Sequence, residues 1–191
     1  MASGVKKMMR DVKIGDKILS ESGNFEPIVG FLDKRIGQTT TFLTLHTNMS
    51  SEITLTGSHV IFIQASNGGK QMSKYARDIV LGDVLINEET GTKAYVVDIS
   101  ESILNGYFAP LTGSGTLVVN GFLASCYASY PHWVAHMAMY PARIWPAFFL
   151  ANDQEGPGAF VAAMKSVGNF VNFRNDGSPP MFMMDAAKME F

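Results

Sequence analysis

Thr56 and His59 are the two residues of this chain whose types and spacing are best suited to chemistry. They stand three residues apart, and the stretch 56–59 interrupts an apolar run, with residues 53–55 before it and residues 60–63 after it. An imidazole can give or take a proton near neutral pH, and a threonine hydroxyl can donate a hydrogen bond to a carbonyl under attack. The pair predicts a proton-handling site on or just past a buried β-strand. The start of the chain shows no obvious nucleophile for this site to serve.

Composition predicts one soluble globular domain with a short appendage. The 191 residues are 47% apolar and only 17% charged, which is enough apolar material for a core. The net charge of −2 argues against a nucleic-acid partner or a polybasic membrane patch. One cysteine, Cys126, excludes an internal disulfide framework. Residues 1–15 lack the apolar region of a signal peptide, and no run reaches the roughly 18 apolar residues that span a membrane.

Two segments of the chain resemble each other. Residues 10–19 and 77–86 both begin with Arg-Asp, continue to a Gly-Asp turn and end in a short apolar strand. The separation is too long for a solenoid repeat and favours a duplicated β-subdomain. Chance similarity around Gly-Asp is the alternative.

The elements needed to hold the site read mainly as strands. Runs of strand-forming residues cover 28–33, 39–45, 53–64, 94–100, 116–119 and 121–128, which predicts an all-β region over about residues 5–130. Residues 67–69 read as a hairpin turn, and Asn120-Gly121 is either a turn or a bulge. Residues 131–140 are predicted helical, and residues 159–173 are predicted to form an amphipathic helix within a tail rich in Met and Phe.

Several short motifs, in order along residues 3–145, resemble those of the hedgehog-type autoprocessing domain. They are residues 3–7, 14–20, 45–47, 55–59, 109–112, 115–121 with 124–128, and 135–136 with 141–143. The resemblance implies the Hint (hedgehog/intein) fold, a β-horseshoe with pseudo-twofold symmetry, over residues 3–145. It also implies that residues 146–191 are a tail for recognising a sterol or another adduct.

The family chemistry that the resemblance implies has two steps. A cysteine at the start of the domain attacks the preceding peptide carbonyl and converts an amide into a thioester. A sterol hydroxyl, or a thiol in its absence, then attacks the thioester and releases the upstream fragment. The domain would thus be an autoproteolytic cysteine endopeptidase and sterol transferase, with its own upstream fragment as substrate, a sterol such as cholesterol as co-substrate and no other cofactor.

The resemblance assigns roles to the first two site residues. His59 would protonate the departing amide nitrogen, since an amide leaves poorly without an acid. Its alternative is a core histidine that is hydrogen-bonded to the backbone. Thr56 would donate to the scissile carbonyl or oxyanion, and its alternative is an ordinary strand threonine.

Two further residues match the family at other positions. Asp33 would deprotonate the sterol hydroxyl, and its alternative is a surface ion pair with Lys34 or Arg35. Cys126 would assist the second step, and its alternative is a buried cysteine that packs as a small apolar residue. His132 and His136 have the spacing of a zinc-binding pair, but Trp133 stands where a catalytic glutamate belongs, so packing is favoured over a metal.

One departure from the family pattern changes the expected activity. Met1-Ala2 precede Ser3 directly, so we expect the strand that carries the nucleophile to be missing and the first step to be inactive in the chain as given. A missing strand would also leave a sheet edge open to association. The second interpretation is a non-catalytic Hint-fold binding module. The family places such domains in the secretory pathway or outside the cell.

Overall fold

A computed structural model describes residues 6–65, 71–150, 155–164 and 166. Strands dominate, as the sequence predicts: β1 (Lys17–Leu19), β2 (Phe25–Pro27), β3 (Gly30–Thr47), β4 (Glu52–Thr56), β5 (His59–Gln64), β6 (Gln71–Tyr75), β7 (Val84–Ile86), β8 (Lys93–Leu111), β9 (Thr116–Val119) and β10 (Phe122–Ala128). The short helical elements are the 3-10 turns η1 (Met9–Asp11), η2 (Glu21–Gly23) and η3 (Ala76–Asp78), and the helices α1 (His132–Ala138), α2 (Tyr140–Ile144) and α3 (Pro146–Phe149).

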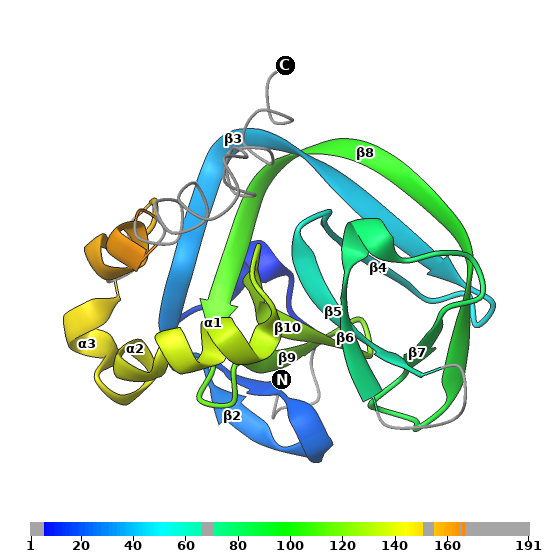
Figure 1. Cartoon of the computed structure of the whole chain (residues 1–191), viewed down its shortest axis with the longest axis horizontal. Helices are drawn as coiled ribbons and strands as arrows, with labels where there is room; N and C mark the ends of the chain where they lie inside the picture. The colour runs from blue at the N-terminus through cyan, green and yellow to red at the C-terminus, as the bar shows by residue number, and fades with distance from the viewer. Residues whose placement is uncertain (1–5, 66–70, 151–154, 165, 167–191) are drawn as a thin grey trace.

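The long strands β3 and β8 form the frame of the molecule. They run antiparallel side by side and arch over it, from the end that carries α2 and α3 to the end that carries β4 and β7 (Figure 1). The main sheet has the order β4-β3-β8-β7-β5-β10-β9, with β6 paired to β5. The small β1–β2 sheet lies apart from it. This curved antiparallel frame confirms the predicted all-β horseshoe.

The sequence pattern divided β3 wrongly into runs at 28–33 and 39–45. The structure has one 18-residue strand, whose pairing with β8 shifts register between Arg35 and Thr39. The residues around this shift are partly or fully exposed, so their side chains show no strand-like alternation of apolar and polar types. The partner strand, rather than the local pattern, keeps this stretch extended.

The predicted duplication is visible as two matching turns. Gly15 and Gly82 both adopt a left-handed conformation, with φ of +88° and +89°. Each follows a 3-10 turn (η1 or η3) and leads into a three-residue strand (β1 or β7). The main-chain N–H of Gly15 donates to Ile28, and that of Gly82 donates to Val96. The two halves of the chain therefore repeat one local structure.

A lysine and an aspartate hold each of these turns. Asp16 Oδ2 accepts from Lys7 Nζ at 2.6 Å and from the main-chain N–H three residues earlier at 2.8 Å. Asp83 Oδ2 accepts from Lys74 Nζ at 2.7 Å and from the equivalent N–H at 2.9 Å. In each half, an equivalent aspartate thus closes the turn and binds a lysine nine residues before it.

The core consists of two clusters of buried side chains. The first joins β3, β8, β9 and β10 to the helices and to the beginning of the tail, where Leu150 and Val161 pack with Ile28 and Phe31. The second lies among β3, β4, β5, β7, β8 and β10 around Leu45. The start of the tail therefore packs onto the preceding domain, and the boundary at residue 145 stays a prediction.

Some of the remaining predicted elements are present in the structure, and others lie outside the residues that it describes. Asn120 and Gly121 (φ +51° and +90°) form a hairpin turn, since Val119 pairs with Phe122 across it. α1 lies within the predicted helix 131–140, and residues 159–164 are helical within the predicted 159–173. The hairpin expected at residues 67–69 and the end of the tail fall outside the described residues.

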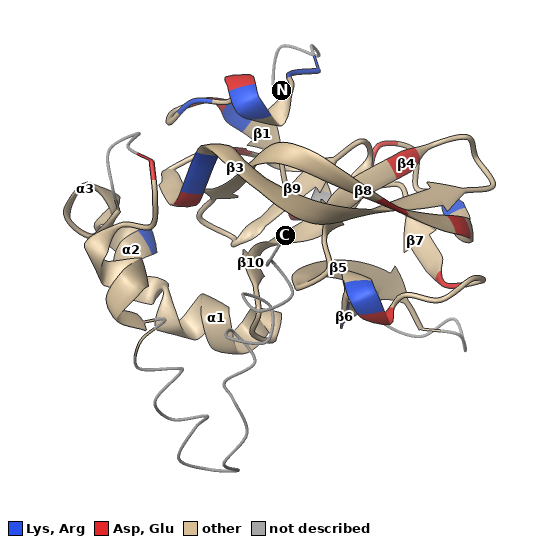
Figure 2. Cartoon of the chain, turned by 90° about the horizontal axis from the view of Figure 1, so that it is seen from above, with Lys and Arg blue, Asp and Glu red and all other residues tan. Residues whose placement is uncertain are grey.

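Charged residues are sparse and scattered along the ribbon (Figure 2). Within α1, α2 and α3, the one Lys, Arg, Asp or Glu residue is Arg143. In the part of the chain that the structure describes, no helix has the length and apolar character needed to span a membrane.

Candidate active site

Thr56 and His59 flank a tight turn. Thr56 ends β4, His59 begins β5, and both side chains are half-buried. The carbonyl of Gly57 accepts from the N–H of Arg77, and the carbonyl of Ser58 accepts from the N–H of Ser129, each at 3.0 Å. The turn is thus held by η3 on one side and by the segment after β10 on the other.

One hydrogen bond orients the His59 ring. Its Nε2 lies 2.8 Å from the main-chain carbonyl oxygen of Ser125 in β10. A carbonyl can only accept, so Nε2 carries the proton, and Nδ1 holds the lone pair of the neutral ring. Burial lowers the pKa of His59, although the bond to Ser125 opposes that shift. The neutral imidazole therefore presents Nδ1 as the atom that can take and return a proton.

This bond to the backbone is the contact that a purely structural histidine would also make. It occupies one nitrogen and leaves the other for chemistry, so the role of His59 stays a prediction.

Asp33 is a buried carboxylate with polar neighbours. It is 7% exposed on β3. Arg35 Nε lies 3.3 Å from Oδ1, and the Tyr107 hydroxyl on β8 donates to Oδ2 at 3.3 Å. Burial and the Asp33 charge raise the pKa of Tyr107, so this hydroxyl remains a hydrogen-bond donor at neutral pH. An ion pair of Asp33 with Arg35 is the alternative role considered from the sequence. The pair does form, but its carboxylate is buried and not on the surface.

Cys126 is buried at 1% exposure in β10. Its Sγ lies 3.5 Å from Thr112 Oγ1, and burial raises the pKa of the thiol to about 11. A thiol with this pKa remains protonated near neutral pH, and the thiolate is the nucleophilic form. Cys126 is thus packed as a protonated thiol, and its assisting role stays a prediction.

Close contacts connect His59 and Cys126, and strand pairing relates Asp33 to them. The His59 ring bonds the carbonyl of the residue just before Cys126. Cys126 in turn contacts Thr112, which follows the end of β8, and β8 pairs with the part of β3 that carries Asp33. Thr56 joins this set through the turn that it shares with His59.

Sequence reasoning missed Ser125 and the role of His132. Ser125 is fully buried, and its Oγ lies 2.9 Å from His132 Nδ1. His136 Nδ1 lies 3.1 Å from the Tyr127 hydroxyl, and the two imidazole rings stack at 5.4 Å. A serine inside the apolar strand β10 was the signal that could have identified the first contact. Among the described residues, no group of three or more His, Cys, Asp or Glu side chains could hold a metal ion.

Comparisons with known proteins define the class. A family model described as "Hint module" matches residues 1–168, so the chain belongs to that family. It is a hedgehog-type Hint domain. It is 32% identical over 158 residues to "Protein hedgehog" of Drosophila virilis and 32% identical over 153 residues to "Protein hedgehog" of Drosophila melanogaster.

The coverage of these matches is uneven. Each hedgehog alignment covers 75% of this chain but 32% of the relative, so the chain spans about a third of the length of the curated proteins that it matches. The crystal structure of the gp41-1 intein matches with a TM-score of 0.49 and 16% identity, over 62% of this chain and 86% of the intein.

Proposed function

We propose that this chain is the autoprocessing domain of a hedgehog-type protein. With a cysteine ahead of Ser3, it forms a thioester with the fragment upstream of it and transfers that fragment to a sterol or another nucleophile. The observation that carries the proposal is the hydrogen bond from His59 to the Ser125 carbonyl. It leaves Nδ1 of a neutral imidazole for proton transfer, three residues along the turn from Thr56.

In the first step, His59 Nδ1 takes the proton of the cysteine thiol, and the resulting thiolate attacks the carbonyl carbon of the peptide bond that precedes it. The carbon–sulfur bond forms, the carbon–nitrogen bond breaks, and the departing nitrogen takes a proton from protonated His59 Nδ1. Because burial lowers the pKa of His59, its protonated ring is a stronger acid than free imidazolium and releases the proton more readily. The Thr56 hydroxyl donates to the oxygen on which negative charge develops.

The nucleophile of this step is a residue other than Cys126. Cys126 is the one cysteine in the sequence, and its buried, hydrogen-bonded thiol is far from ionisation at neutral pH. We therefore expect the acyl shift to need a cysteine placed ahead of Ser3. The sequence as printed is expected to be inactive in this step.

In the second step, Asp33 accepts the proton of the sterol hydroxyl. The alkoxide oxygen bonds to the thioester carbon, and the thiolate leaves. An alcohol is a poor nucleophile near neutral pH, so a base within hydrogen-bond reach is needed. The contacts of its two oxygens with Arg35 and with the Tyr107 hydroxyl support this role, because they hold the Asp33 carboxylate in one place on β3.

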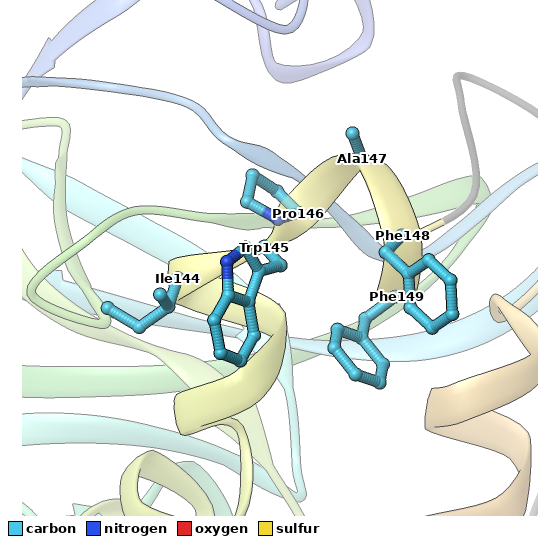
Figure 3. Close-up of a pocket in the computed structure, with 6 residues that line it drawn as sticks. All are labelled: Ile144, Trp145, Pro146, Ala147, Phe148 and Phe149. Carbon is cyan, nitrogen blue, oxygen red and sulfur yellow. The ribbon is translucent and has the colours of Figure 1, made fainter.

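An apolar surface near the start of β3 supports a sterol as acceptor. A pocket of about 540 Å³ is lined by Ile144, Trp145, Pro146, Ala147, Phe148 and Phe149 (Figure 3). Leu150, just after α3, packs against Gly30, and the N–H of Gly156 donates to the carbonyl of Lys34 at 2.8 Å. The tail thus contacts β3 on both sides of Asp33, at Gly30 and at Lys34.

The proposal includes the partners and the location that follow from it. The substrate is the fragment upstream of the domain, and processing takes place in the secretory pathway, from which the product is released. Association through a sheet edge belongs to the same proposal, and β4 and β9 end the order of the main sheet.

The test is cleavage of a fusion that carries a reporter and a cysteine-led strand ahead of Ser3. The fusion is incubated with dithiothreitol, with sterol or with neither, and the released reporter is followed on a gel. We expect both additives to induce cleavage. His59→Ala should abolish both reactions, whereas Asp33→Ala should abolish only the sterol reaction. Asp11→Ala, which changes an exposed carboxylate, is the matched control for Asp33→Ala.

A folded fusion that is cleaved under none of these conditions would contradict the proposal. That outcome would favour the non-catalytic Hint-fold binding module instead. Circular dichroism of each fusion separates loss of activity from loss of folding.

A further inference from the structure

The carbonyl that orients His59 belongs to an irregular stretch of β10. β10 pairs with β5 at Ala124, opposite Ile61, and at Ala128, opposite His59, and the register shifts between these two pairs. Ser125 lies in this stretch. Its carbonyl bonds to the His59 side chain instead of to a ladder partner on β5.

The Ser125 side chain stabilises this irregular stretch through two hydrogen bonds. Its Oγ accepts from the N–H of Tyr127 at 3.0 Å and lies 2.9 Å from His132 Nδ1. The hydroxyl has one proton to donate, and His132 Nδ1 is the acceptor beside it. Burial lowers the pKa of His132, so its ring is neutral at neutral pH and its Nδ1 can accept that bond.

His132 is itself fixed by its place in α1 and by two ring contacts. It begins α1, packs edge-on against Phe62 of β5 at 5.2 Å, and stacks on His136 at 5.4 Å with the ring planes 16° apart. Phe62 lies three residues after His59 on the same strand. His132 therefore connects α1 to both strands that build the His59 site.

We propose that Ser125 and His132 are positioning residues for His59. They hold the irregular stretch of β10 so that the Ser125 carbonyl keeps the His59 ring in its Nε2–H form and leaves Nδ1 for proton transfer. The consequence for the reaction rate rests on the proposed autoprocessing function. The effect on the His59 ring does not depend on that function.

The first test is the protonation pattern of the imidazole nitrogens, read from long-range proton–nitrogen NMR spectra of the ¹⁵N-labelled full chain near neutral pH. In the unmodified chain, His59 should show the Nε2–H form. His132→Phe keeps a ring but removes the acceptor, and Ser125→Ala removes the hydroxyl. Both should convert His59 to a mixture of the two neutral forms.

Two further variants serve as controls. His132→Asn keeps a hydrogen-bonding group near the position of Nδ1 and should preserve the His59 pattern. His136→Phe removes the neighbouring histidine, whose Nδ1 bonds to Tyr127 rather than to Ser125, and should also preserve it. An unchanged His59 pattern in both Ser125→Ala and His132→Phe would overturn the proposal, provided that their amide spectra remain those of a folded chain.

The second test is the rate of dithiothreitol-induced cleavage in the cysteine-led fusion. Ser125→Ala and His132→Phe should slow it by roughly ten- to a hundredfold, since misplacing a reacting group costs about this much, and His132→Asn should restore most of the rate. If the unmodified fusion is not cleaved while the NMR results hold, the proposed function fails and the positioning of His59 stands. If the unmodified fusion is cleaved but the His59 pattern is unchanged in both variants, the positioning proposal fails alone.

Discussion

The imidazole of His59 and the main-chain carbonyl of Ser125 are joined by a 2.8 Å hydrogen bond across 66 residues of sequence. This bond crosses from β5 to β10 where their ladder is irregular. It determines which nitrogen of the ring can react, because the carbonyl requires a donor. A long-range contact thus defines the chemistry of a local motif.

The burial of Cys126 predicts slow reaction with thiol reagents. The folded chain should react with Ellman's reagent much more slowly than the chain in denaturant, since the thiol is 1% exposed and its pKa is raised to about 11. The measurement is the absorbance change over time with and without denaturant. Equal rates in the two conditions would show that Cys126 is accessible in the folded chain and would reopen a nucleophilic role for it.

The matching turns predict two equivalent sites of stability. Asp16→Ala and Asp83→Ala should each lower the free energy of unfolding by about 0.5–1.5 kcal/mol, because each removes the carboxylate that accepts from a main-chain N–H and from a lysine. Urea denaturation measures both. Glu101→Ala, at an exposed position of β8, should change stability by less than about 0.5 kcal/mol. A loss at only one of the two turns would contradict their structural equivalence.

Three histidines predict how stability depends on pH. Burial lowers the pKa values of His59 and His132, and burial together with the charge of Arg143 lowers that of His136 to about 4. The unfolded chain therefore binds protons on these rings at higher pH than the folded chain does. Their contribution is fully present above a pH of about 6.5 and is lost as the pH falls through the folded pKa values.

The measurement of this effect is the urea midpoint at a pH of about 7 and of about 5. We expect the midpoint to fall with pH, and we expect His136→Phe to reduce that fall. A midpoint that rises on acidification would mean that these rings are not buried as neutral groups.

The apolar surface of α3 predicts a selective effect on the second step. Phe148 is 83% exposed at the pocket of about 540 Å³. Phe148→Ser should reduce sterol-induced cleavage of the cysteine-led fusion and leave dithiothreitol-induced cleavage unchanged, because a small thiol does not need the surface. Met49→Ser, at an exposed apolar residue in the turn between β3 and β4, is the control. Equal rates of sterol-induced cleavage in the two variants would show that the pocket does not bind the sterol.

Much of this fold could be predicted from local patterns. β9 has the bounds that its pattern predicts, and the repeated Gly-Asp segments become two matching turns, because φ values near +90° need glycine there. The continuity of β3 could not be predicted, since its central residues are exposed and are kept extended by β8.

The site could be predicted only in part, for a related reason. Thr56 and His59 are close in sequence, so their pattern marks the turn that they flank. Ser125 and His132 act on His59 from other elements, and no local pattern connects a serine in β10 to a histidine in β5. Contacts of this kind depend on how strands that are far apart in the sequence pair with each other.

The most direct test of the central claim is the intact mass of the fragment released by dithiothreitol from the cysteine-led fusion. The account predicts a fragment that carries dithiothreitol as a thioester, released roughly 100- to 10,000-fold more slowly by the His59→Ala variant, because the departing amide then lacks its acid. A released fragment with a free carboxylate and no adduct, formed equally fast by both proteins, would contradict the claim that His59 serves thioester formation.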